Sequence, residues 1–300
     1  MNEATAAPRV PLIAGLGVIA DRYDAILCDI WGVLHNGRQA FPAASDALAA
    51  FRRGGGAVVL ISNAPRPSAP IKAQVVRLGV SPDAFDAIVT SGDVAIGLIA
   101  ERGAAPVHHI GPKRDMSLFE AAAARAGERP VLVGLEDASY VVCTGLFDDE
   151  VETPDDYRER LSAMAARRLP LICANPDLVV HRGADLIYCA GAIARAYEAL
   201  GGAAIYAGKP YAPIYHAALA AAGAALKAPL ARSRVLAIGD AMRTDIAGAA
   251  GQGLDALFVT AGIHREDLHG AGASAAEDRL QSLFARENLR PVAAMPALTP

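Results

Sequence analysis

Five short runs rich in Val, Ile and Leu are the feature of this chain that most limits its fold. They cover residues 25–30, 57–61, 87–90, 235–238 and 256–259. Apolar runs this short, in which polar and apolar residues do not alternate, are typical of strands buried on both faces of a parallel sheet. Helix-like segments lie between them, at residues 43–53, 71–78, 213–225 and 244–250. This alternation predicts an α/β fold built on a doubly wound parallel sheet.

The middle of the chain repeats the same rhythm. Its apolar runs cover residues 107–110, 140–144, 170–174 and 186–190. A segment this long is no loop between two elements of one sheet, so we expect an inserted α/β domain over residues 104–204. Residues 1–103 and 205–300 would then form one discontinuous core domain. The chain beyond residue 270 is less well defined, and we expect its Pro-rich end, residues 291–300, to be loosely ordered.

Polar side chains lie at the ends of three of the apolar runs. Asp29, Ser62 and Asp240 each come where a predicted strand ends. Ligands of open parallel sheets bind at the carboxyl ends of the strands. We therefore expect two carboxylates and a hydroxyl to point into one crevice.

Four motifs carry these and other polar residues, in the order Cys28 to Leu34, Leu60 to Asn63, Gly208 to Pro210 and Ile238 to Asp245. Together they resemble the four motifs of the haloacid dehalogenase superfamily, and the resemblance runs from about Tyr23 to Gly262. The long insert looks like the large α/β cap of the class IIA branch. Asn175-Pro176-Asp177 is similar to a cap segment of that branch. Its members include pyridoxal-phosphate, nitrophenyl-phosphate and nucleotide phosphatases.

The resemblance implies a Mg²⁺-dependent phosphatase that forms an aspartyl-phosphate on Asp29. Mg²⁺ takes oxygen ligands, which Asp29, Asp240 and the backbone carbonyl of Trp31 would supply. Asp245 would orient the site from behind these ligands. On their own, Asp240 and Asp245 are also typical of carboxylates at the amino end of a helix.

Further residues are implied to hold the substrate. Lys209 would neutralise the phosphoryl oxygens as a catalytic residue, and Ser62 and Asn63 would contact them. Asn175 and Asp177 would reach the substrate from the cap. Two structural alternatives stay open: Ser62 capping the turn that follows it, and Asn175 and Asp177 forming a turn before Leu178.

Trp31 departs from the pattern of family phosphatases, which carry a second aspartate at this position as the general acid and base. An indole can do neither job. Acid–base catalysis is worth about 10² to 10⁴-fold, so we expect a slow enzyme or one that prefers good leaving groups. His35 in the adjacent loop is a candidate substitute for this acid and base.

Two other functions are compatible with these motifs. Trp31 also suits a regulatory relative that binds a phosphorylated metabolite without turning it over. Haloacid dehalogenases carry an aromatic residue at this position, but they need no metal and lack the paired carboxylates that Asp240 and Asp245 represent. Dehalogenation is therefore the weaker interpretation.

Composition excludes several classes of partner. The net charge is −4 and no basic block occurs, so we expect no nucleic-acid partner. No apolar run reaches 18 residues, and the apolar stretch near the N-terminus is a poor signal peptide, so we expect a cytoplasmic protein without a membrane partner. The expected partner is a small phosphorylated metabolite. Relatives with this cap often pair through it, which suggests a homodimer by analogy only.

Overall fold

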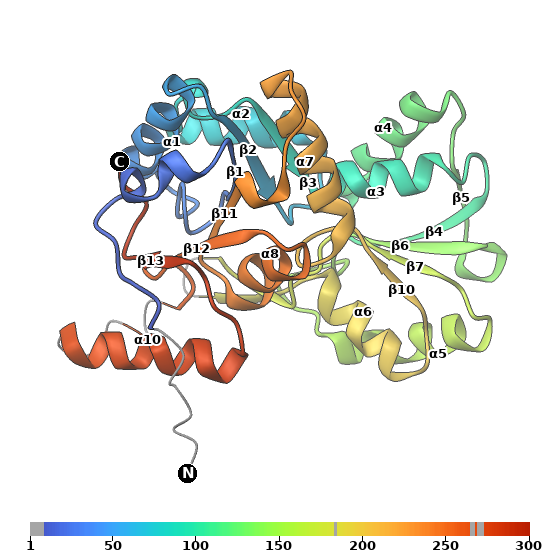
Figure 1. Cartoon of the computed structure of the whole chain (residues 1–300). Coiled ribbons are helices and arrows are strands. Elements are labelled where there is room, and N and C mark those ends of the chain that lie inside the picture. Colours follow the sequence, from blue (N-terminus) through green and yellow to red (C-terminus); the bar gives the residue numbers. More distant parts are fainter. Residues whose placement is uncertain (1–8, 183–184, 265–267, 269–272) are drawn as a thin grey trace, which may run out of the picture. The chain divides into compact units, whose positions relative to one another are not determined.

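The computed structural model describes residues 9–182, 185–264, 268 and 273–300, and Figure 1 shows how their elements are arranged. Contacts between residues divide the chain into two compact units. The first comprises Met1–Leu60, Val75–Ala87 and Leu219–Pro300, and the second comprises Ile61–Gln74 and Ile88–Ala218. Each unit is thus built from separate stretches of the chain.

A six-stranded sheet in the order β13-β12-β11-β1-β2-β3 forms the centre of the core. Its strands are β1 (Ala25–Asp29), β2 (Ala57–Ser62), β3 (Ala87–Thr90), β11 (Val235–Gly239), β12 (Asp255–Val259) and β13 (Ala293–Met295). Strand β1 pairs in parallel with β11, and β11, β12 and β13 continue the parallel pairing. The side chains of β1 and β11 are all buried, as the unbroken apolar runs predict. The predicted α/β fold with a doubly wound core is confirmed.

Four helices of these segments lie close to the expected positions, and a further one, α10, was not expected. They are α1 (Pro42–Arg53), α2 (Ser68–Leu78), α7 (Ala212–Leu226), α8 (Ala247–Gly251) and α10 (Ala273–Glu287). Helix α10 packs on β12, where the rings of Phe258 and Phe284 meet edge to face at 5.6 Å. A helix predicted from residue 244 instead begins with a π-helical turn at Met242–Ile246, which leads into the short α8.

A separate five-stranded sheet, in the order β10-β7-β6-β4-β5, lies in the second unit. Its strands are β4 (Pro106–Ile110), β5 (Val131–Leu132), β6 (Tyr140–Cys143), β7 (Leu171–Cys173) and β10 (Ala204–Tyr206). Along β6, Val141 and Cys143 join one buried cluster while Tyr140 and Val142 join another. Both faces of this sheet are therefore covered, and the inserted α/β part is confirmed.

Four helices supply that cover. They are α3 (Ser91–Ala100), α4 (Ser117–Ala126), α5 (Arg158–Ala166) and α6 (Ala190–Ala199). In Figure 1, α3 and α4 lie on one face of the five-stranded sheet and α5 and α6 on the other. The sequence pattern predicted that the run at residues 186–190 joins this sheet, but it does not. It contributes β9 (Asp185–Tyr188), which pairs antiparallel with β8 (Val179–Arg182).

The expectation of a loosely ordered end over residues 291–300 is wrong. Leu257 pairs with Ala293, and the three residues of β13 are fully buried. The last residues then run along the N-terminal segment, where Leu16 N–H donates to the Thr299 carbonyl at 2.8 Å. Pairing with β12, rather than any local pattern, orders this segment.

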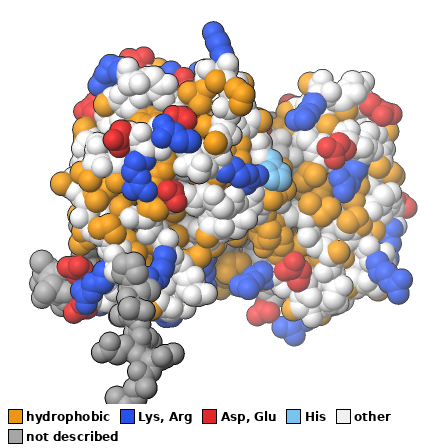
Figure 2. All heavy atoms as spheres, viewed as in Figure 1, with side chains coloured by type: hydrophobic (Ala, Val, Ile, Leu, Met, Phe, Trp, Pro, Cys, Tyr) orange, Lys and Arg blue, Asp and Glu red, His pale blue; other side chains and the backbone are white. Residues whose placement is uncertain are grey.

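The surface mixes side chains of different kinds. On the face shown in Figure 2, Lys and Arg are interspersed with Asp, Glu and apolar side chains. Among the described residues, no helix combines the length and the apolar character needed to cross a membrane.

Candidate active site

The order of the core sheet places β1 beside β11, where strand order reverses. Strands β2 and β3 lie on one side of β1, and β11, β12 and β13 lie on the other. Such a switch point opens a crevice at the carboxyl ends of the two central strands. Cys28 stands opposite Ile238 in the register, so Asp29 and Asp240 leave neighbouring strands at this end.

Three buried carboxylates meet there. Oxygen atoms of Asp29, Asp240 and Asp245 lie within 4.8 Å of one another. Their exposed fractions are only 8, 5 and 2%. Like charges this close and this far from water repel one another, and a divalent cation would offset that repulsion. An all-oxygen donor set is also what Mg²⁺ prefers, so these residues fit the ion.

Backbone N–H groups hold each carboxylate in place. Ile30 N–H donates to Asp29 at 2.7 Å, and Ile263 N–H donates to Asp240 at 2.7 Å. Ala241 N–H donates to Asp245 at 3.1 Å. Asp245 lies inside the π-helical turn, and its own N–H donates to the Ala241 carbonyl at 3.0 Å. The turn therefore brings this third carboxylate back toward the strand end.

Two glycines crowd Asp240. A Cβ atom on Gly32 would lie 2.2 Å from Asp240 Oδ2, and one on Gly262 would lie 1.9 Å from the same atom. Gly32 also has φ of +80°, which L side chains rarely adopt. Only glycine fits at these two places. Sequence reasoning missed this role, because nothing local shows which side chain faces a glycine.

Trp31 follows on the turn after β1. Its side chain is 47% exposed, and its ring meets the His35 ring edge to face at 5.3 Å. His35 is buried, and its Nδ1 accepts the Gly37 N–H at 2.9 Å. Burial lowers the pKa of His35, so the neutral ring acts in this turn as a hydrogen-bond acceptor.

The second unit gathers other predicted residues. Asn63 Nδ2 donates to Asp177 at 2.8 Å, and Asn63 Oδ1 accepts the Lys209 N–H at 2.7 Å. Lys209 itself is buried, with 2% exposed. Asn175 Oδ1 accepts the Asp177 N–H at 3.1 Å, which is the turn expected as the alternative to substrate contact. Ser62 Oγ likewise accepts the Ala64 N–H at 3.2 Å, so it caps its own turn.

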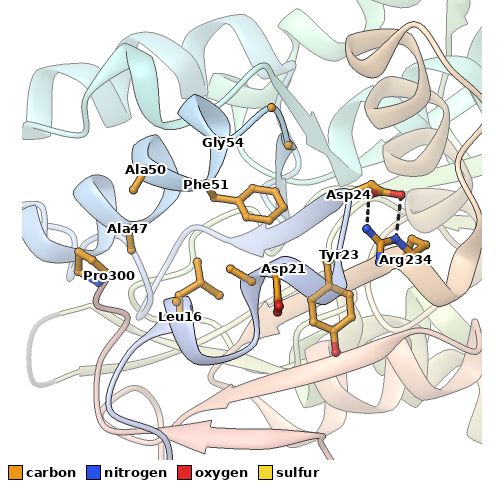
Figure 3. Close-up of a pocket in the computed structure, with 14 residues that line it drawn as sticks. Leu16, Asp21, Tyr23, Asp24, Ala47, Ala50, Phe51, Gly54, Arg234 and Pro300 are labelled. Carbon is orange, nitrogen blue, oxygen red and sulfur yellow. Dashed lines mark hydrogen bonds and ion pairs between the residues drawn. The ribbon is translucent and has the colours of Figure 1, made fainter.

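A hollow of about 540 Å³ opens in the first unit at the other end of the strands. Figure 3 shows the Phe51 ring on its wall and Arg234 paired with Asp24, whose Oδ1 lies 2.6 Å from the guanidinium. Asp24 and Arg234 come just before β1 and β11, whereas Asp29 and Asp240 come at their carboxyl ends. The hollow is therefore separate from the carboxylate cluster.

Comparison with known proteins places these motifs in a family. Residues 26–125 match a family model described as haloacid dehalogenase-like hydrolase, and residues 206–283 match one described as HAD-hydrolase-like. A haloacid dehalogenase-like hydrolase from Brucella suis is 45% identical, with a TM-score of 0.81, over 96% of this chain and 100% of that one. The chain belongs to the haloacid dehalogenase-like hydrolase family.

Other solved structures with this fold have named activities. A glycerol phosphate phosphatase from Mycobacterium tuberculosis, crystallised with calcium, is 27% identical over 82% of this chain and 68% of that one, with a TM-score of 0.62. The same enzyme was also crystallised with magnesium. A p-nitrophenyl phosphatase from Archaeoglobus fulgidus shares the fold at 20% identity, with a TM-score of 0.70 over 92% of this chain and 96% of that one. No curated protein sequence matched the chain.

Proposed function

We propose that this haloacid dehalogenase-like hydrolase is a Mg²⁺-dependent phosphatase acting on a small phosphorylated metabolite. The buried cluster of Asp29, Asp240 and Asp245 at the switch point of the sheet carries the proposal. A phosphatase of the same family, crystallised with magnesium, supports the choice of ion. Asp29, Asp240 and the Trp31 carbonyl would hold the ion, and Asp245 would orient them. Bound Mg²⁺ would supply positive charge against the phosphoryl oxygens.

Asp29 is the proposed nucleophile. A carboxylate oxygen of Asp29 attacks phosphorus, the bond from phosphorus to the ester oxygen breaks, and that oxygen leaves with the electron pair. Water then attacks the aspartyl-phosphate, releases inorganic phosphate and restores the carboxylate. Ile30 N–H, which donates to Asp29 at 2.7 Å, fixes the direction from which this carboxylate acts.

The proposed roles of residues in the second unit rest on the motifs in which these residues occur. Lys209 would neutralise phosphoryl oxygens, with Ser62 and Asn63 as hydrogen-bonding partners. Residues 104–204 would form the cap that governs specificity, with Asn175 and Asp177 near the substrate. Asn63 donates a hydrogen bond to Asp177 and accepts one from the Lys209 N–H, and these two bonds support a common role for the three residues.

Trp31 sets the expected rate. The indole at this position can neither protonate the leaving group nor activate water, so both half-reactions lose a factor within about 10² to 10⁴. A regulatory protein that binds a phosphorylated metabolite without turnover is the second candidate, and the same residue favours it.

Hydrolysis of nitrophenyl phosphate, with and without Mg²⁺, tests the proposal. We expect metal-dependent release of nitrophenol with a burst, which Asp29→Asn abolishes. Asp21→Asn is the matched control, because it makes the same change at the other end of the strands. Trp31→Asp should speed the steady state. A silent wild type with an active Trp31→Asp variant would instead favour the regulatory protein, and activity in Asp29→Asn would refute the mechanism.

A further inference from the structure

Trp31 is a large apolar side chain that the fold leaves half exposed, close in sequence to the proposed nucleophile. It stands two residues after Asp29 and is 47% exposed. It is also the only tryptophan of the chain. An exposed aromatic side chain near fixed polar groups is typical of ligand contact, because a few apolar walls and fixed polar groups together make a binding site.

The turn holds the indole in a defined place. Residues 31 and 35 form a bridge, in which Gly32 N–H donates to the His35 carbonyl at 2.9 Å. The His35 ring meets the indole edge to face, with ring planes at 78°. On another side the indole lies against bare backbone, since a Cβ atom on Gly37 would come within 2.4 Å of Trp31 Cη2. The exposed part of the ring is therefore a fixed surface, which loses little entropy when a ligand covers it.

The same residue limits the chemistry. Without an acid at position 31, the ester oxygen must leave as an anion. Phenols ionise near pH 10, as tyrosine does, whereas the hydroxyl of water ionises only near 15.7 and aliphatic alcohols resemble it. Phosphate esters of aromatic alcohols can therefore react without an acid, and esters of aliphatic alcohols lose most from its absence.

We propose that Trp31 is a specificity-determining residue, and that the substrates of this site are phosphate monoesters of planar aromatic alcohols. The indole would stack on the leaving group while Asp29 attacks phosphorus. One replacement thus removes the acid and selects substrates that do not need it. This inference rests on the proposed phosphatase function.

Binding of stable analogues tests the stacking without turnover. Phenylphosphonate and cyclohexylphosphonate differ only in whether the ring is aromatic, and neither has an ester oxygen to lose. With Mg²⁺ present, we expect phenylphosphonate to bind about tenfold more tightly by calorimetry. It should also shift the fluorescence of the protein saturably, because selective excitation of tryptophan reports on Trp31 alone.

Two variants separate aromatic stacking from simple packing. Trp31→Phe should keep the preference for phenylphosphonate, whereas Trp31→Leu, apolar but not aromatic, should lose it. The ratio of kcat/KM for phenyl phosphate to that for cyclohexyl phosphate should fall in Trp31→Leu, chiefly through a higher KM for the aryl ester. Circular dichroism of both variants checks that they fold.

The outcomes distinguish the two proposals. Equal binding of the two phosphonates to the wild type, or an unchanged preference in Trp31→Leu, would overturn the stacking proposal even if the enzyme is active. A retained preference for phenylphosphonate in a protein without Mg²⁺-dependent turnover would support the aromatic site and refute the phosphatase function.

Discussion

Replacing Gly32 with alanine should displace the Asp240 carboxylate, because the new side chain would collide with it. The new Cβ atom would lie 2.2 Å from Asp240 Oδ2, whereas ordinary contact begins at 3.4 Å. The difference, 3.4 − 2.2, means that the oxygen must move by about 1.2 Å. Gly262 crowds the same oxygen, and Ile263 N–H binds it at 2.7 Å, so the carboxylate has little room to retreat.

The magnitude follows from two separate effects. A left-handed backbone costs a residue with a Cβ atom about 1–2 kcal/mol, and Gly32 has φ of +80°. Metal ligands tolerate displacements of only about 0.2 Å, and a misplacement of about 1 Å in a reacting site costs roughly 10²-fold in rate. We therefore expect Gly32→Ala to lose stability, most of its affinity for Mg²⁺ and about 99% of its kcat.

Gly253→Ala is the matched control. Gly253 has φ of +66°, and nothing lies within 4 Å of the position where its Cβ atom would be. Urea unfolding with and without Mg²⁺, together with the nitrophenyl phosphate assay, compares the two variants. Gly253→Ala should lose only backbone stability and keep both the stabilisation by Mg²⁺ and the rate. If Gly32→Ala behaves in the same way, the close approach to Asp240 has no role in the site.

Two further predictions concern the second unit. Burial, and then the charge of His108, lower the pKa of His109 to about 4, so its proton is bound more weakly in the folded protein than in the unfolded chain. The free energy of unfolding should therefore fall as pH drops from about 6.5 toward 4, by about 2 kcal/mol at pH 5. Urea unfolding of the His109→Asn variant should not show this loss. Equal pH profiles for the wild type and the variant would contradict the prediction. The Tyr197 side chain is fully buried, and its hydroxyl donates to the Leu169 carbonyl at 2.6 Å. Tyr197→Phe should therefore lower the free energy of unfolding, measured in urea, by about 1–3 kcal/mol. A loss under about 0.5 kcal/mol would show that the Leu169 carbonyl finds another partner.

The sequence predicts the parts of the fold in which local pattern and burial agree. The apolar runs before Asp29 and Asp240 are strands with bounds within one residue of those expected. Both carboxylates lie at strand ends because a parallel sheet puts such positions at one edge. The closeness of Asp29 to Asp240 follows from the same reasoning. Asp245 lies inside a helical turn, and only the family resemblance led us to expect it beside them. The catalytic and binding roles of all three residues stay predictions.

Other parts depend on contacts between distant segments. Ala293, Ala294 and Met295 form a strand only because β12 pairs with them, and three residues have no periodicity to read. The helix expected from residue 244 starts as a π-helical turn, since Asp245 takes the Ala241 N–H with its side chain. The closeness of Gly32 and Gly262 to Asp240 is likewise set by tertiary structure alone.

The pairing of β1 with β11 also has a consequence for synthesis of the protein. Ala25 pairs with Val235, so more than 200 residues must be made before the second strand of this pair exists. The five-stranded sheet needs no residue beyond 206 and can form earlier on the ribosome. Until residues 235–240 emerge, the edge of β1 has no β11 partner and Asp29 has neither of its carboxylate neighbours. Delayed or truncated translation should therefore yield chains that lack the metal site and expose an unpaired apolar strand, which is the kind of surface that chaperones bind and that aggregates grow from.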